Sequence, residues 1–156
     1  MEKTNALNTP WKMWLYYFRH LPSLVFWGVR IRSVNPEGAS VTIPFSWRTQ
    51  NPFKSTYFAA LCGAAELSTG VLALLAMEGQ GPISMLVVSL EADFVKKAVT
   101  RTTFTCNDGE AFRETIQKAI TTGEAQVFTA VAEGVQTTGE KVAEVRITWS
   151  FKVKKR

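Results

Sequence analysis

The fold of this chain is decided by residues 51–77, which read NPFKSTYFAALCGAAELSTGVLALLAM. Between residues 57 and 77 this stretch carries a single charge, that of Glu66. A surface helix keeps its polar residues on one side at a period of about 3.6 residues, whereas this segment would place small and apolar residues on all sides of the helix. The pattern therefore predicts a helix that is buried on every face.

A turn and two hydroxyl residues mark the start of this helix. Asn51 precedes Pro52, and the residue before a proline is disfavoured in the helical conformation. Ser55 or Thr56 is then the expected N-cap, because a hydroxyl oxygen at that position accepts a backbone N–H from the first turn.

Glu66 lies in the middle of this helix, where an ionised carboxylate is disfavoured unless it is paired or protonated. It could be a structural residue whose hydrogen bonds are satisfied in the core. The helix could also span a membrane, since 21 residues reach about 31 Å. A central carboxylate and strand-like flanking segments argue against that second alternative. We expect Glu66 to be a functional carboxylate and expect no stable membrane insertion.

Composition indicates a globular chain that forms one domain over residues 1–156. Of its 156 residues 46% are hydrophobic and 20% are charged, and 18 basic against 13 acidic residues give a net charge of +5. This excess favours anionic partners such as nucleotide phosphates, nucleic acid or an acidic membrane surface. The only basic run is residues 152–156, which we interpret as a solvated tail, so nucleic acid is not an expected partner.

Cysteine and histidine are too scarce for several classes of site. Cys62 and Cys106 cannot form a disulfide framework or a zinc site. Cys62 lies one turn before Glu66 on the same helix face and could be a nucleophile, although a buried cysteine is usually a small hydrophobe. His20 is the only histidine, so we expect no metal site and no histidine-dependent hydrolysis. The N-terminus shows no signal-peptide pattern, and we expect a cytoplasmic protein.

The rest of the chain alternates like β-strands, with helical segments at residues 10–21 and after residue 107. The first helix, within an N-terminal helical segment at 1–27, is rich in aromatics and could cover the core or lie at a membrane interface. Gly123 ends the second helix. The expected strands are residues 28–34, 41–47, 85–95, 99–106, 125–132 and 145–153. Pro44 places the second of these at a sheet edge or at a bulge.

The expected fold class is therefore α+β, with an antiparallel sheet of about six strands around one long central helix and an N-terminal helix in addition. A helix that is apolar on all sides needs a sheet that curls around it. Such a sheet leaves the helix partly open, and a second subunit would cover the opening.

These elements resemble the hotdog superfamily over residues 28–153, and in particular its acyl-CoA thioesterase-like branch, which includes the phenylacetic-acid-pathway thioesterases. That branch carries an asparagine, a His-Gly-Gly step opening the helix, and an acid further along it. By that spacing Asn51 matches the asparagine and Glu66 the acid, while Tyr57, Phe58 and Ala59 stand in place of His-Gly-Gly. This departure concerns the substrate pocket more than the fold.

The resemblance implies hydrolysis of an acyl-CoA or related thioester, with Glu66 as general base or direct nucleophile and Asn51 positioning the water or the carboxylate. The backbone N–H of Phe58 or Ala59 would hold the thioester oxygen. The substrate-binding residues would be Tyr57, Cys62, Lys96, Lys97 and Arg101, the three basic ones for the phosphates of coenzyme A.

No cofactor is implied beyond coenzyme A as part of the substrate. The expected partners are an acyl-CoA or acyl-carrier thioester and a second copy of the chain, in a homodimer or in a tetramer built as a dimer of dimers. The alternative function is a non-catalytic acyl-CoA or acyl-carrier binding module on the same fold.

Overall fold

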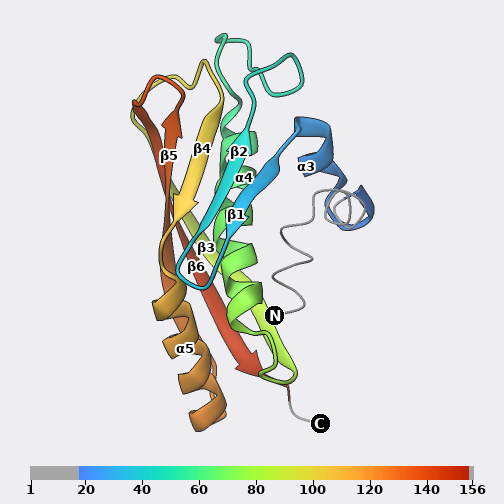
Figure 1. Cartoon of the computed structure of the whole chain (residues 1–156), viewed down its shortest axis with the longest axis vertical. Helices are drawn as coiled ribbons and strands as arrows, with labels where there is room; N and C mark the ends of the chain where they lie inside the picture. Colours follow the sequence, from blue (N-terminus) through green and yellow to red (C-terminus); the bar gives the residue numbers. More distant parts are fainter. Residues whose placement is uncertain (1–17, 155–156) are drawn as a thin grey trace.

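The computed structural model describes residues 18–154, and these form an α+β fold in which one sheet wraps around one long helix (Figure 1). The helices are α3 (Pro22–Trp27), α4 (Phe58–Ala76) and α5 (Gly109–Thr122). The strands are β1 (Arg30–Val34), β2 (Ala39–Ile43), β3 (Ile83–Phe94), β4 (Thr102–Cys106), β5 (Gln126–Gln136) and β6 (Lys141–Val153). The sequence-based prediction of fold class is confirmed.

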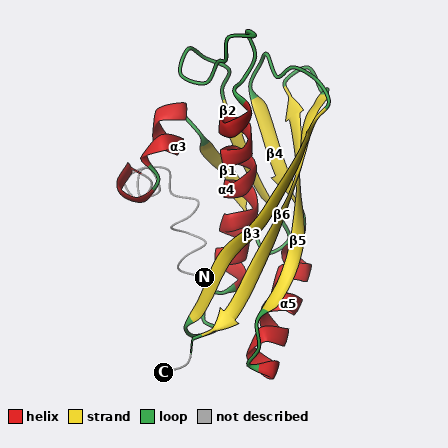
Figure 2. Ribbon diagram, turned by 180° about the vertical axis from the view of Figure 1, so that it is seen from behind, coloured by secondary structure: helices red, strands yellow, loops and turns green. Residues whose placement is uncertain are grey.

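The six strands form a single antiparallel sheet in the order β1-β2-β4-β5-β6-β3. Seen from behind, the long strands β3 and β6 cross in front of the lower part of α4, while α5 lies against the lower end of the sheet (Figure 2). Strand β3 follows α4 in the chain yet pairs with β6 at the sheet edge. The curved sheet therefore wraps around part of the helix.

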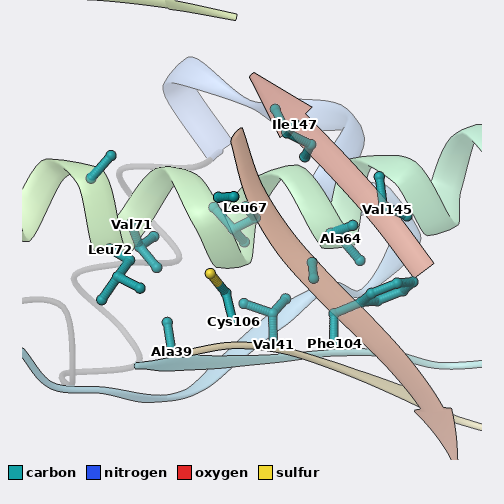
Figure 3. Close-up of a cluster of buried hydrophobic side chains, with 14 of the residues drawn as sticks. Ala39, Val41, Ala64, Leu67, Val71, Leu72, Phe104, Cys106, Val145 and Ile147 are labelled. Atoms are coloured by element: carbon teal, nitrogen blue, oxygen red, sulfur yellow. The ribbon is translucent and has the colours of Figure 1, made fainter. Parts of the chain in front are cut away.

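The core lies between α4 and the concave face of the sheet. Eleven of the nineteen helix residues are buried, among them Ala64, Leu67, Val71 and Leu72. Figure 3 shows these side chains facing a layer from the strands; it consists of Ala39 and Val41 of β2, Phe104 and Cys106 of β4, and Val145 and Ile147 of β6. The small residues of α4 let the strands approach it closely. Strands of 5 to 13 residues are therefore long enough to pack around the helix.

Burial of α4 is not complete on every face, which corrects the expectation drawn from its composition. A strip at helical spacing, formed by Ala59, Cys62, Gly63 and Glu66, is only partly covered, and Leu74 on the same side is 42% exposed. The strip exists because the sheet of one chain encircles only part of the helix. Within residues 18–154, α4 is also the one helix long and apolar enough to cross a membrane, but its burial is that of a core helix.

The predicted N-cap is wrong. Tyr57, in an extended conformation, is the N-cap of α4, and its side chain makes no capping hydrogen bond. The two hydroxyl groups expected to cap are used elsewhere, since Thr56 Oγ1 donates to the carbonyl oxygen of Ala98 at 3.0 Å and Ser55 Oγ bonds to Asn51.

The second predicted strand is too long. Strand β2 ends at Ile43, whereas Phe45 and Trp47 lie in a loop, with Trp47 77% exposed. Strand β2 is interior to the sheet, between β1 and β4. A proline inside an interior strand would remove a ladder hydrogen bond, so Pro44 ends the strand instead of marking an edge or a bulge.

Other strand boundaries also differ from the prediction, and three of them lie in β4, β5 and β6. Strand β4 starts at Thr102 instead of residue 99, β5 continues to Gln136, and β6 starts at Lys141. The extension of β5 passes through Gly134, where a Cβ atom would lie 2.7 Å from the ring of Phe104. Glycine is needed here because the ring of Phe104 occupies the place of a side chain.

The predicted helix over residues 10–21 lies mostly outside the described residues. Residues 18–20 are helical, and Leu21 then leaves the helical conformation before Pro22 begins α3. Helix α3 packs against the open strip of α4, since Trp27 and Leu24 are the nearest neighbours of Gly63.

The two ends of the sheet differ. Strand β1 has five residues, exposes Arg30 and Arg32, and pairs irregularly between Ile31 and Ser33. Strand β3 has twelve residues, is paired only with β6, and leaves Leu86 65% exposed. Short, basic and irregular edges resist pairing with another strand, whereas long apolar ones favour it.

Candidate functional site

The start of α4 offers free hydrogen-bond donors. Among the hydrogen bonds of the described residues, the N–H groups of Ala60 and Leu61 both donate to the carbonyl oxygen of Tyr57, while those of Phe58 and Ala59 find no acceptor. The N-terminus of a helix also carries a partial positive charge. This end of α4 can therefore bind a carbonyl oxygen or an anion.

A pocket of about 480 Å³ opens beside these donors. Its lining includes five of the residues predicted for the site, namely Asn51, Tyr57, Phe58, Lys96 and Lys97. Ala59, Cys62, Glu66 and Arg101 are not part of it. The residues predicted for the site are thus divided: five line this pocket, whereas Ala59, Cys62 and Glu66 lie on the partly covered strip further along α4.

Three contacting aromatic side chains line the pocket at the helix start. The ring of Phe58 contacts Tyr57 at 5.0 Å and Phe94 at 6.3 Å between ring centroids, both edge-on. Sequence reasoning missed Phe94, although its place at the end of an alternating strand indicates that it faces the helix. The three rings form an apolar wall against which an apolar group of a ligand can pack.

Asn51 organises the loop that borders the pocket. Its side-chain oxygen accepts the N–H groups of Phe53 and Ser55 at 3.0 and 3.1 Å, and its amide nitrogen donates to Ser55 Oγ at 3.1 Å. These bonds form an Asx-type turn that sets the path of the chain into α4. The amide is therefore engaged within the loop.

The three basic residues predicted for phosphate binding lie in different surroundings. Lys96 forms an ion pair with Glu140, and Lys97 Nζ donates to the carbonyl oxygen of Phe53 at 3.3 Å. Both are exposed and border the pocket. Arg101 is exposed as well but lies outside the pocket lining, so only the two lysines are brought to this site.

Glu66 supplies the carboxylate predicted for the site. Within residues 18–154 no side chain forms an ion pair or a hydrogen bond with its carboxyl oxygens, whereas its backbone oxygen accepts Thr69 Oγ1 at 3.0 Å. Burial raises the pKa of this carboxyl above its ordinary value of 4.5. A carboxylate with a raised pKa can accept a proton at neutral pH, which is the property of a general base.

Gly70 and Trp149 complete the surroundings of this carboxylate, and sequence reasoning missed both. A Cβ atom on Gly70 would lie 3.5 Å from Glu66 Oε1 and 3.5 Å from the Trp149 ring. The glycine thus leaves space shared by the carboxylate and the indole. Trp149 Nε1 donates to Thr69 Oγ1 at 3.0 Å, which fixes the ring beside the helix.

Cys62 is poorly suited to act as a nucleophile. It is half-buried, and burial raises the pKa of its thiol, so the reactive thiolate is disfavoured. The described residues also contain no group of three or more His, Cys, Asp or Glu side chains that could hold a metal ion.

A larger groove of about 1010 Å³ lies between the C-terminal end of α4 and α5. Basic and acidic side chains of α5, including Arg113 and Glu114, border an apolar floor of Leu72 and Leu75. None of the predicted site residues borders it. The smaller pocket at the helix start is therefore the better candidate, because it joins free backbone donors to two lysines.

The long helix wrapped by an antiparallel sheet defines the hotdog fold. The family model described as "Domain of unknown function (DUF4442)" matches residues 16–151, and the chain belongs to this family. A comparison with curated proteins finds no match.

Solved structures agree on the fold. The Pseudomonas aeruginosa protein PA5026, named a probable thioesterase, has a TM-score of 0.80 at 20% identity, covering 93% of this chain and 97% of that one. The Chlorobaculum tepidum protein OLEI01261, of unknown function, has a TM-score of 0.78 at 15% identity, covering 96% and 99%. The Haemophilus influenzae thioesterase HI1161 has a TM-score of 0.68 at 15% identity, covering 91% of each chain.

Proposed function

We propose that this protein hydrolyses an acyl-CoA or related thioester, with Glu66 as the general base. The observation that carries the proposal is the partly buried Glu66 carboxylate, which has no side-chain partner within residues 18–154. It lies on the partly covered strip of the same helix whose first N–H groups find no acceptor among these residues. The likeness to PA5026 and HI1161, both named as thioesterases, supports it at the level of fold. Lys96 and Lys97 suit the phosphates of a coenzyme A moiety.

The chemistry requires one water molecule and no cofactor. The carboxylate of Glu66 takes a proton as the water oxygen attacks the thioester carbon, and the N–H of Phe58 or Ala59 holds the oxyanion that forms. The carbon–sulfur bond then breaks. The proton on Glu66 passes to the leaving sulfur, which leaves a carboxylic acid and a free thiol.

A homodimer would bring the two groups together. Phe58 and Glu66 are eight residues apart, which is roughly 12 Å along a helix, whereas a base must act within about 3 Å directly or through one water. Two α4 helices packed antiparallel would set each helix start beside the partner's Glu66, giving two composite sites. The partly covered strip on α4 and the free edge of β3 are the surfaces suited to this association.

The direct test is turnover of short, long and aromatic acyl-CoA esters, measured by release of free thiol. We expect Glu66→Gln to lower turnover by about 10²- to 10⁴-fold, the usual contribution of a general base. Glu114→Gln, at an exposed carboxylate on α5, is the matched control and should leave turnover unchanged. A folded wild type that is inactive on every ester, or full activity of Glu66→Gln, would contradict the proposal.

Coexpressed mixed dimers test how the site is shared. One chain carries Glu66→Gln and the other Ala59→Pro, a substitution that removes a donor yet is tolerated in the first helical turn. Composite sites leave one site intact, so about half of the wild-type activity remains if the sites are independent. Complete loss, with both parent homodimers folded and inactive, would show that each chain builds its own site.

The crowded helix start favours one alternative, a non-catalytic acyl-CoA or acyl-carrier binding module. Phe58 is 56% exposed and stands between Tyr57 and Phe94, where it narrows the approach to the free donors. Tight binding of coenzyme A esters to the wild type without thiol release would select this alternative. Phe58→Gly with measurable turnover would instead identify the ring as the obstacle.

A further inference from the structure

The end of the molecule that holds α3 and the loop after β2 exposes large aromatic side chains. Trp47 is 77% exposed, Phe53 72% and Phe26 52%. Phe26 and Trp47 contact each other edge-on, with 6.4 Å between ring centroids. Single exposed apolar residues are common, but a group of aromatic rings at one end of a chain indicates an interaction surface.

Basic residues accompany these rings. Arg48 and Lys54 are exposed in the same loop, and the Arg48 guanidinium lies near Gly28 at the C-terminus of α3. We call Phe26, Trp47, Arg48, Phe53 and Lys54 the aromatic–basic patch. The loop that carries four of them forms the upper end of the molecule, next to α3 (Figure 1).

Positive charge is concentrated in the segment of the chain that carries the aromatic–basic patch. Residues 18–57 hold five basic residues and one acidic residue, a net charge of +4, whereas residues 58–154 hold nine basic and eleven acidic residues, a net charge of −2. The one acid, Glu37, lies in the turn that precedes β2, at the opposite end of that strand from the loop. The segment that carries the aromatic–basic patch is thus positive, whereas the rest of the described residues, 58–154, are slightly acidic.

We propose that the aromatic–basic patch docks this protein reversibly on an anionic lipid surface. Aromatic rings enter the interfacial layer of a bilayer, and basic side chains are attracted to anionic headgroups. A protein partner with an acidic surface would match the charge but would not require these exposed rings. The combination of rings and positive charge is that of interfacial membrane proteins.

Docking would also place the candidate site near the lipid. Phe53 belongs both to the aromatic–basic patch and to the pocket at the start of α4, and its carbonyl oxygen accepts Lys97 Nζ. The mouth of the pocket would then face the bilayer surface, where amphiphilic long-chain esters accumulate. The docking itself is independent of the proposed hydrolysis, because it is measured without any thioester.

The test is cosedimentation of the full chain with vesicles of phosphatidylcholine alone and of equal parts phosphatidylcholine and phosphatidylserine. We expect binding only to the second kind, with release near 1 M salt because exposed charges are then screened within about 3 Å. Arg48→Gln with Lys54→Gln should weaken binding by about fivefold for each charge, on the order of 25-fold together. Phe26→Ala with Trp47→Ala should weaken it on the order of tenfold.

The matched control is Lys118→Gln with Lys152→Gln, which removes the same charge from exposed positions on α5 and β6. This pair should leave vesicle binding unchanged. Absence of binding to either vesicle, equal binding to both, or equal loss in the control pair would overturn the proposal. So would dissociation of an oligomer by Phe26→Ala with Trp47→Ala, since the patch would then be a subunit interface.

Discussion

Replacing Glu66 by glutamine should stabilise the protein at neutral pH while it strongly lowers the proposed activity. The carboxyl has no partner within residues 18–154, and burial raises its pKa above the ordinary value of 4.5. A raised pKa in the folded state means that the folded protein is more stable with the Glu66 carboxyl protonated than with it ionised. Its contribution to stability is fully present below the unfolded pKa and is lost as pH rises through the folded pKa.

The magnitude follows from proton linkage. Between the pKa of the unfolded chain and the raised pKa of Glu66, the folded state holds one more proton than the unfolded state. The free energy of unfolding of the wild type then falls by about 1.4 kcal/mol for each pH unit because of this group, and levels off above the folded pKa. Glu66→Gln removes this slope, since the amide is neutral at every pH.

Urea denaturation from pH 5 to pH 8, at one fixed protein concentration, measures the difference between wild type and Glu66→Gln. The free energy of unfolding of the variant should exceed that of the wild type only slightly at pH 5. The difference should increase with pH and then reach a plateau. Glu114→Gln should track the wild type throughout. A variant less stable than wild type at pH 8, or a difference independent of pH, would show that the carboxylate has a stabilising partner and would refute the reasoning.

Two further predictions concern glycine and cysteine. Gly134→Ala should destabilise the fold by about 1–3 kcal/mol in urea denaturation, because the new Cβ would meet three ring atoms of the fully buried Phe104 at 2.7–3.2 Å. A change within about 0.5 kcal/mol, as for a neutral surface substitution, would contradict the packing described. Cys62→Ala should retain thioester turnover within about threefold, because burial raises the pKa of the thiol and a protonated thiol is a poor nucleophile; a loss as large as that of a catalytic base would assign the thiol a role in the reaction.

Much of the fold was predictable because composition and periodicity report burial directly. The uncharged stretch around Glu66 predicts a core helix, and the clean alternation that ends at Val153 predicts a half-buried strand. The boundaries were harder because they depend on partners. Nothing local indicates that Thr56 donates to Ala98, 42 residues away, and so cannot cap α4. Likewise Pro44 ends β2 only because that strand proves to be interior to the sheet.

The candidate site was predictable only in its chemistry. The carboxylate at Glu66 stands out because a charge inside an apolar helix needs an explanation, whereas Gly70 beside it looks like any small residue of α4. The contact of Phe94 with Phe58 depends on the curvature of the sheet, which residue spacing does not specify. Sequence therefore identified reactive groups, and the fold identified the residues that shape the space around them.

The contrast between the two ends of the sheet limits how the protein can assemble. Strand β1 is short, exposes arginines and pairs irregularly, so it cannot extend the sheet into a neighbouring molecule. Strand β3 can, and among the strands of residues 18–154 it is the only edge of this kind. If two copies pair along β3, neither copy keeps an edge strand that is free to pair with a third. The association would then stop at a closed two-fold dimer instead of growing into a fibre. Any larger assembly would have to form through the faces of the sheet.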